Sequence, residues 1–184
     1  MAASSRWSQE RYLDAYWFAA RAHRGQEFPG TDGLPYVLHI GMVAMEVVGA
    51  LQHEPAEQPD LAVQCALLHD TLEDTEATYE QLTERFGTAV ADGARALSKD
   101  ETLPKAERMP DSLRRIREQP REVWMVKLAD RICNLQEPPH YWSSDKRARY
   151  RAEARDILAA LGEASAYLAQ RLQRRIDDYA RYIE

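Results

Sequence analysis

Four ionisable side chains occur within six residues near the middle of the chain, directly after an apolar run that begins at Leu61. If this segment is helical, His69 and Glu73 lie one turn apart on the same face. Asp70 and Asp74 have the same spacing. An imidazole beside a carboxylate is a ligand pair for Mn, Fe, Zn or Ni. The spacing predicts a metal-binding pair followed by an acidic pair near a metal-bound water or a substrate phosphate; the alternative is an exposed, acidic helix end.

Two further segments carry residues of the same types. His39 follows Pro-Tyr-Val-Leu at the expected start of a helix. Asp130 interrupts the apolar face of a helix expected over residues 120–135, and Asn134 shares its face one turn later. A carboxylate on an apolar helix face is costly unless it is paired or bound to a metal. A two-histidine, two-aspartate site drawn from three helices would comprise His39, His69, Asp70 and Asp130.

The elements that must position these residues are helices. Capping residues, apolar periodicity and glycine or proline breakers predict helices at about 8–24, 37–52, 60–73, 78–87, 88–97, 120–135, 143–161 and 162–184. Residues 26–36 are rich in glycine and proline and predict a loop. Residues 98–119 predict a partly ordered, mobile segment with one helical piece near 111–118. Because no alternating strand pattern is present, the predicted fold class is all-α.

Bulk composition limits the domain organisation and the partners. A chain of 184 residues predicts one domain, here 8–184 after a lead-in at 1–7. A net charge of −6 provides no overall positive field for a nucleic acid polymer or an anionic membrane. There is no run of 18 apolar residues, and Cys65 and Cys133 are expected to be buried thiols. These features predict a soluble, cytoplasmic protein and leave its oligomeric state open.

Three sequence blocks, taken in order, resemble those of a known family. They are Pro-Tyr-x-x-His, Leu-His-Asp-Thr-x-Glu-Asp-Thr and Lys-Leu-Ala-Asp-Arg-x-x-Asn-Leu. The pattern is similar to that of the HD-domain superfamily of metal-dependent phosphohydrolases. Within it, the chain resembles the alarmone hydrolases, meaning the hydrolase domain of RelA/SpoT-type enzymes and the stand-alone small alarmone hydrolases. The resemblance covers most of the chain and leaves no room for a synthetase domain, so the stand-alone type is the closer match.

The resemblance implies a single HD-type helical bundle that removes the 3′-pyrophosphate of ppGpp or pppGpp and leaves GDP or GTP. It implies that His39, His69, Asp70 and Asp130 bind one Mn²⁺. It also implies that Glu73 and Asp74 are the catalytic acidic pair, although these two could instead orient the histidines. Which carboxylate acts as acid and which as base stays open. Asn134 matches a residue that lines the nucleotide pocket.

Other candidate substrate contacts follow from residue type. Phosphoryl transfer needs positive charge on the outer phosphate oxygens, for which Lys99, Lys105 and Lys146 are candidates. Tyr150 is a candidate for stacking on ribose or base. These residues would act on a small nucleotide rather than on a macromolecule.

One position departs from the family pattern. Members commonly carry a basic residue after the His-x-Gly-Gln element, where it contacts the guanine base, whereas here Gln26 is followed by Glu27 and Phe28. Phe28 could stack on a base, and Arg24 could supply the cation. The base preference therefore stays open, with an adenine alarmone such as (p)ppApp or the 2′-phosphate of NADPH as alternative substrates. A non-catalytic nucleotide-binding module is the alternative from another class.

Overall fold

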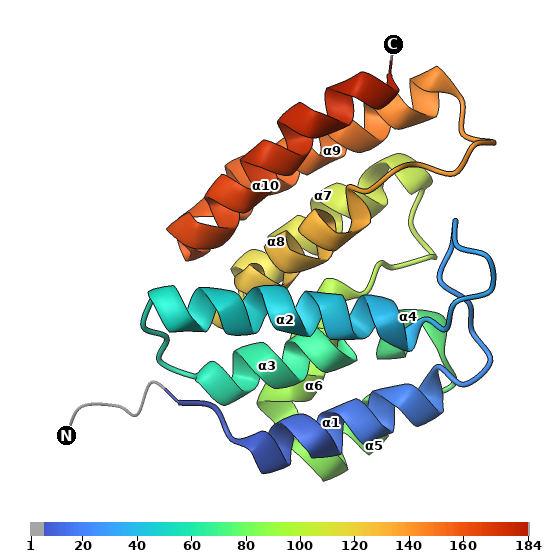
Figure 1. Ribbon diagram of the computed structural model, residues 1–184. Coiled ribbons are helices and arrows are strands. Elements are labelled where there is room, and N and C mark those ends of the chain that lie inside the picture. Colours follow the sequence, from blue (N-terminus) through green and yellow to red (C-terminus); the bar gives the residue numbers. More distant parts are fainter. Residues whose placement is uncertain (1–5, 184) are drawn as a thin grey trace.

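The computed structural model describes residues 6–183, which form an assembly of helices (Figure 1). The all-α prediction is confirmed: within the described part, extended pairing is limited to one isolated bridge between Glu27 and Pro35. Of the predicted lead-in, residues 1–5 lie outside the described residues. The elements are α1 (Gln9–Ala22), α2 (Val37–His53), α3 (Pro59–Leu68), α4 (Thr71–Asp74), α5 (Tyr79–Phe86), α6 (Thr88–Leu97), α7 (Lys105–Arg117), α8 (Arg121–Asn134), α9 (Ser144–Leu161) and α10 (Ala166–Asp178), with 3₁₀ turns at Gly162–Ala164 and Tyr179–Tyr182.

Helix α3 lies at the centre and is apolar on every side, which is typical of a fully buried helix. It packs against α1, α2 and α8, while α9 and α10 run side by side over the other face of α8 (Figure 1). Helix α8 is buried along most of its length. The core therefore brings α2, α3 and α8 together, and these are the segments expected to carry metal ligands. Within residues 6–183, no helix combines the length and apolar character needed to cross a membrane.

The helix predicted over residues 60–73 is interrupted, and this corrects the prediction. Helix α3 ends at Leu68, and α4 begins at Thr71. The imidazole Nδ1 of His69 lies 2.9 Å from the carbonyl oxygen of Ala66 and donates to it. A continued helix would use that carbonyl for the amide of Asp70, so the side chain competes with the backbone ladder. The histidine therefore ends the helix that positions it.

The segment 98–119 is also better ordered than its sequence predicts, because α7 spans Lys105–Arg117 with Pro110 inside it. The guanidinium of Arg115 donates to the carbonyl oxygens of Arg95, at 2.6 Å, and Ser98, at 2.7 Å, at the end of α6. The hydroxyl of Ser112 donates to the carbonyl of Ala96 in the same helix end. These bonds satisfy carbonyls that a helix end leaves free and hold α7 in place. The helical piece predicted near 111–118 therefore begins earlier, at Lys105, and the sequence alone could not indicate these contacts.

The side chain of Glu122 in α8 binds the backbone just before α3, and its removal tests how much this contact stabilises the fold. Its side chain is 1% exposed, and Oε1 accepts the backbone N–H groups of Glu57 and Gln58, each at 3.0 Å. Because Glu122→Ala removes a buried acceptor shared by two backbone N–H groups, we expect the free energy of unfolding in urea to fall by about 2 kcal/mol. Glu118→Ala removes an exposed ion pair with Arg114 and should cost about 0.5 kcal/mol or less. Equal losses for the two variants would contradict this role.

Candidate metal centre

Four donor atoms from three parts of the chain converge inside the helical core. The Nε2 atoms of His39 and His69 lie 3.3 Å apart, and His69 Nε2 lies 2.9 Å from Asp70 Oδ2. Asp130 Oδ1 is 3.5 Å from His39 Nε2 and 3.9 Å from His69 Nε2. Ligands bound at about 2.1 Å to one ion lie roughly 3–3.5 Å from one another. The spacing of His39, His69 and Asp70 suits one divalent metal, and Asp130 lies close to both imidazoles.

The four candidate ligands reach this point from three parts of the chain. His39 projects from the core face of α2, Asp130 from α8, and the pair His69 and Asp70 occupies the break between α3 and α4. The two histidines are 0% and 2% exposed, and Asp130 is 6% exposed. Within the described chain, the side chains of His39, His69 and Asp70 each offer one donor atom, and these three atoms lie within 4.8 Å of one another.

Electrostatics keep the carboxylates ionised although they are buried. Burial alone would raise the pKa of Asp70, but the imidazoles of His69 and His39 hold that pKa below its ordinary value. Burial opposes ionisation of Asp130 in the same way, and the ammonium of Lys127 with the two imidazoles lowers its pKa well below the usual range. Burial lowers the pKa of His69, yet Asp70 and Asp130 outweigh it and raise that pKa to about 9. An ionised aspartate is the form that binds a metal.

Hydrogen bonds and packing orient the two imidazoles. Since a carbonyl oxygen only accepts, the bond from His69 Nδ1 to Ala66 fixes the proton on Nδ1 and points Nε2 at the other ligands. His39 is held by packing, because its ring centre lies 5.3 Å from that of Phe28 and 5.2 Å from that of Tyr36. Phe28 is thus in contact with one of the candidate metal ligands.

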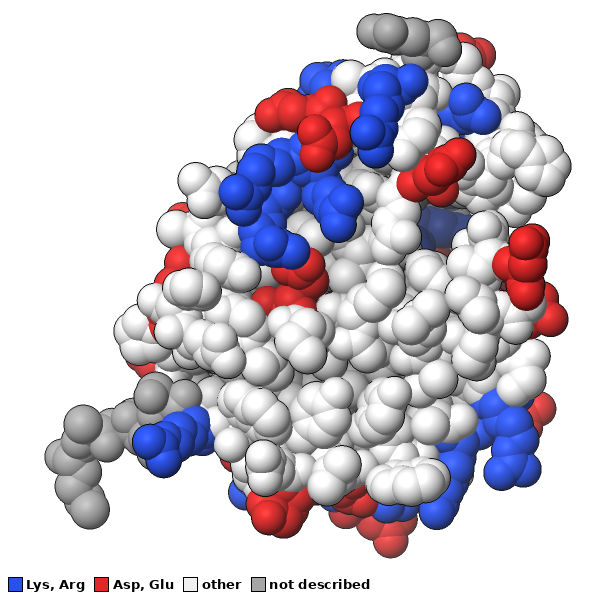
Figure 2. Space-filling model, in the orientation of Figure 1, with Lys and Arg blue, Asp and Glu red and all other residues white. Residues whose placement is uncertain are grey.

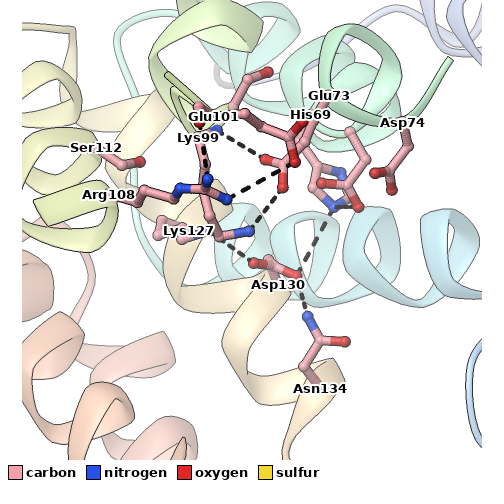
Figure 3. A network of polar contacts seen from close by, with 12 residues as sticks. His69, Glu73, Asp74, Lys99, Glu101, Arg108, Ser112, Lys127, Asp130 and Asn134 are labelled. Atoms are coloured by element: carbon pink, nitrogen blue, oxygen red, sulfur yellow. Dashed lines mark hydrogen bonds and ion pairs between the residues drawn. The ribbon is translucent and has the colours of Figure 1, made fainter. Parts of the chain in front are cut away.

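The aspartates have their own supporting contacts. The hydroxyl of Tyr36 donates to Asp70 Oδ2, and Lys127 Nζ donates to Asp130 Oδ2 at 3.1 Å. The amide of Asn134 donates to Asp130 Oδ1, so this predicted pocket residue also touches a metal ligand. Figure 3 shows Asp130 between Lys127 and Asn134. The sequence analysis did not identify Tyr36 as a partner, although it lies in the Pro-Tyr-x-x-His block.

The acidic pair lies beside this cluster in two different environments. Glu73 Oε1 is 2.8 Å from Lys99 Nζ, and Glu73 Oε2 accepts the Lys99 backbone N–H at 2.8 Å (Figure 3). Asp74 keeps an exposed edge and accepts a 3.4 Å bond from the amide of Gln26. Partial burial, together with the negative charges of Asp70 and Glu73, raises the pKa of Asp74. Lys99, predicted as a phosphate contact, is therefore a partner of Glu73.

A cleft of about 460 Å³ opens next to the acidic pair. The predicted substrate contacts Phe28, Asn134 and Tyr150 line it, as does Asp74. One wall comes from the loop 26–36, and the facing wall comes from the segment after α8. Its described lining is rich in aromatic side chains and amides, and the charged groups among that lining are Asp74 and Glu137. The volume and the aromatic walls suit a nucleoside.

The remaining predicted cations occupy three different places. Lys146 Nζ lies 4.0 Å from the ring centre of Trp142, which lines the nucleoside cleft. Arg24 lines a second cleft of about 750 Å³ that meets the first at Asp74. Lys105 lines a third cleft between α7 and α9, which shares no lining residue with the nucleoside cleft. The structure thus brings Lys146 and Arg24 to the borders of the site and places Lys105 elsewhere.

Two supporting groups have only faint sequence signals. Arg131 is 4% exposed, and its guanidinium lies 4.3 Å from the ring centre of Tyr150 in the cleft wall. The sequence signal for Arg131 is a charged residue among apolar residues of its helix. Buried His23 donates from Nδ1 to Gln26 Oε1 at 2.6 Å, and Gln26 in turn donates to Asp74. This second chain of contacts links α1 to the acidic pair, which spacing alone does not indicate.

Comparison with known proteins decides the family. The family model described as HD domain matches residues 15–166. The chain belongs to the HD-domain family. A curated HD-domain relative, guanosine-3′,5′-bis(diphosphate) 3′-pyrophosphohydrolase MESH1 of Danio rerio, is 34% identical over 166 residues, which cover 88% of this chain and 89% of that protein. The Homo sapiens protein of the same name is 32% identical, with coverage of 88% and 90%.

A solved structure of an HD-domain relative has the same architecture. It is described as a metazoan ortholog of SpoT that hydrolyzes ppGpp and plays a role in starvation responses. It superposes with a TM-score of 0.81 at 25% sequence identity, covering 97% of this chain and 99% of that chain. The all-α HD-domain fold is therefore confirmed, and the near-complete coverage agrees with the expected resemblance to stand-alone hydrolases.

The ligand assignment predicts that Asp70→Ala abolishes metal binding. The substitution removes a charged donor from the buried cluster, so we expect the dissociation constant for Mn²⁺, measured by isothermal titration calorimetry, to rise more than about 100-fold. Glu73→Ala serves as the control and should bind Mn²⁺ as the unmodified protein does. Equal Mn²⁺ occupancy in the unmodified and Asp70→Ala proteins would refute the assignment.

Tyr36→Phe tests the contact that orients Asp70. Loss of the hydroxyl leaves Asp70 Oδ2 without this donor, and we expect metal affinity to fall about tenfold. The matched control is Tyr12→Phe, which removes a hydroxyl from a half-buried ring packed on Trp7 and Tyr16. The same calorimetric titration checks both variants. An unchanged affinity for Tyr36→Phe would show that Asp70 needs no orienting bond.

Proposed function

We propose that this chain hydrolyses the 3′-pyrophosphate of the alarmone ppGpp or pppGpp, releasing pyrophosphate and leaving GDP or GTP. The observation that carries the proposal is the buried set of two histidines and two aspartates beside an acidic pair and a nucleoside-sized cleft. Relatives named as 3′-pyrophosphohydrolases match this chain along nearly its whole length and theirs. We place the activity in the cytoplasm, consistent with the two free cysteines, Cys65 and Cys133.

The proposed cofactor is a single Mn²⁺. It would be held by His39, His69, Asp70 and Asp130. A bound divalent ion supplies a nucleophile at neutral pH and stabilises charge on the phosphoryl group. The protein contributes a buried cluster whose carboxylates are ionised and whose imidazole orientations are set before an ion binds. Mixed nitrogen and oxygen donors agree with Mn²⁺ and also accept neighbouring divalent metals.

The charge distribution suggests how the substrate lies. The nucleoside cleft has aromatic walls, and its charged lining groups are the carboxylates of Asp74 and Glu137, so it suits a base and ribose better than phosphates. The second cleft, beyond Asp74, carries Arg21, Arg24 and Arg85 among its lining residues. We place the phosphates between this arginine-bearing cleft and the metal ligands, where cations offset their charge.

The two carboxylates of the acidic pair take different roles in the proposal. Lys99 holds Glu73 through both its ammonium and its backbone amide, which orients Glu73 as the group that positions the attacking water. Asp74 has a raised pKa and lies where the two clefts meet, so it is placed to protonate the leaving 3′-oxygen. Separation of acid and base roles between paired carboxylates follows from such unequal surroundings.

The proposal of guanine over adenine rests on the chemistry of the cleft. Glu137 lines it, and one carboxylate can accept both the N1–H and the N2–H of guanine, whereas the corresponding edge of adenine offers one donor. Phe28 lines the same cleft and is available to stack on the base, where relatives commonly place a cation. An adenine alarmone and NADPH remain the alternatives that share the metal site.

Glu73→Gln should separate metal binding from turnover. It keeps the size of the side chain but removes the carboxylate, so we expect kcat for pyrophosphate release from ppGpp to fall about 100- to 10,000-fold with Mn²⁺ affinity unchanged. Exposed Glu80 on α5 provides the control Glu80→Gln, which should retain full activity.

The unmodified Mn²⁺-loaded protein should be assayed against ppGpp, ppApp and NADPH in parallel. Release of pyrophosphate from ppGpp supports the proposal. Cleavage of an adenine nucleotide alone would favour the first alternative. Tight binding of ppGpp without any product, even at high protein concentration, would favour a non-catalytic nucleotide-binding module.

A further inference from the structure

Helix α2 carries apolar residues both on the face that packs on the core and on the opposite face. Among its seventeen residues, the single Asp, Glu, Lys or Arg is Glu46, and both of its carboxylate oxygens lie 2.5 Å from the guanidinium of Arg171. The core face includes Ile40, Val43 and Val47. A helix that is apolar all round is normally buried all round. In one copy of this chain, however, the opposite face of α2 is left in contact with solvent.

That outer face forms a continuous stripe. Leu38, Gly41, Met45 and Val48 follow one another at spacings of three and four residues and therefore share one side of the helix. We call these residues, with Leu13 and Trp17 of α1, the outer patch. Figure 2 shows that the surface over α2 and the adjoining part of α1 is largely free of Lys, Arg, Asp and Glu, which gather at its edges.

The exposure of the outer patch is high for apolar side chains. Leu13, Trp17, Leu38 and Met45 are 54%, 61%, 43% and 69% exposed. At roughly 150–250 Å² for a large side chain, these residues leave on the order of 500 Å² of apolar surface in water. This is as large as the largest patch found on a typical monomer. It would form the apolar centre of an interface of ~800 Å² per partner, whose rim would include the charged residues at its edges.

We propose that the outer patch is the interface of a homodimer in which α2 of one copy packs on α2 of a second copy across a twofold axis. An uncharged surface is complemented by another uncharged surface, because a charged partner would lose hydration without gaining an ion pair. The chain carries 24 basic and 30 acidic residues, yet few of them lie on the surface around the middle of α2 (Figure 2). A second copy supplies the matching surface, and self-complementarity is what a twofold contact requires.

The small residue in the stripe and the position of the cleft agree with this arrangement. A Cβ on Gly41 would meet the Tyr16 hydroxyl at 3.9 Å, an ordinary van der Waals contact, so the stripe on α2 adjoins α1 at this small residue. The nucleoside cleft is lined by the loop 26–36, the segment after α8, and parts of α9 and the C-terminal turn. None of the outer-patch residues contributes to that lining. Dimerisation through α2 thus leaves the cleft open.

The test measures the mass of the full-length, Mn²⁺-loaded protein by sedimentation velocity from about 1 to 100 μM. We expect a dimer for the unmodified protein and a dissociation constant raised about 100-fold or more by Met45→Glu, because two carboxylates would then face one another across the axis. The matched control Ala159→Glu adds the same charge at an exposed position of α9 and should leave the dimer intact.

Met45 is largely exposed in one copy, so Met45→Glu should fold normally, which circular dichroism and an unchanged thermal transition of the dilute protein will verify. Because the outer patch is separate from the metal cluster, the Met45→Glu monomer should keep its affinity for Mn²⁺. A monomeric unmodified protein at 100 μM would overturn the proposal, and the outer patch would then belong to a different partner. A dimer that survives Met45→Glu would place the interface elsewhere and overturn it equally.

Discussion

The carboxylates of buried Asp130 and partly buried Asp70, held beside two buried imidazoles, are the interaction on which the rest of this structure depends. An aspartate in a helical core is costly unless hydrogen bonds and opposite charge compensate it. Asp130 meets this condition through Lys127 and Asn134 of its own helix, and Asp70 meets it through Tyr36 and His69. Because these partners come from three parts of the chain, satisfying the charges also fixes how α2, α8 and the α3–α4 break are arranged. The metal site and the tertiary fold are thus one network.

The backbone leaves regular helix geometry between two neighbouring candidate ligands. His69 keeps helical dihedrals, φ −57° and ψ −36°, and Asp70 is the first residue to depart from them. Asp70 adopts φ −98° and ψ 0°, in the sparsely populated bridge region where many active-site residues are found. The imidazole bond to Ala66 ends the regular ladder at this point. A side chain of the site therefore creates the backbone geometry that the site needs.

Local sequence signals predict the features whose causes are local. The Thr78–Gln81 capping box forms as expected, since both of its hydrogen bonds lie within four residues. The four candidate metal ligands stand out in the sequence because each type is chemically distinctive in its block, and the structure brings their side chains close together. Long-range contacts could not be predicted in this way. Tyr36 reaches Asp70 across 34 positions, and Arg115 orders α7 through carbonyls 17 to 20 positions earlier. No spacing rule within one helix carries that information.

Helix α2 shows how one element can serve two functions on opposite faces. Its core face presents His39 to the other ligands, and all four donors come from a single chain, so the metal cluster is complete without a second copy. The outer face would instead stabilise the proposed dimer, because packing on a second copy removes its apolar stripe from water. His39 is already 0% exposed within one copy, so its position is set by the core packing of α2 and does not require the outer face to be covered. The apolar composition of α2 thus serves the core on one side and leaves the other side available to a partner.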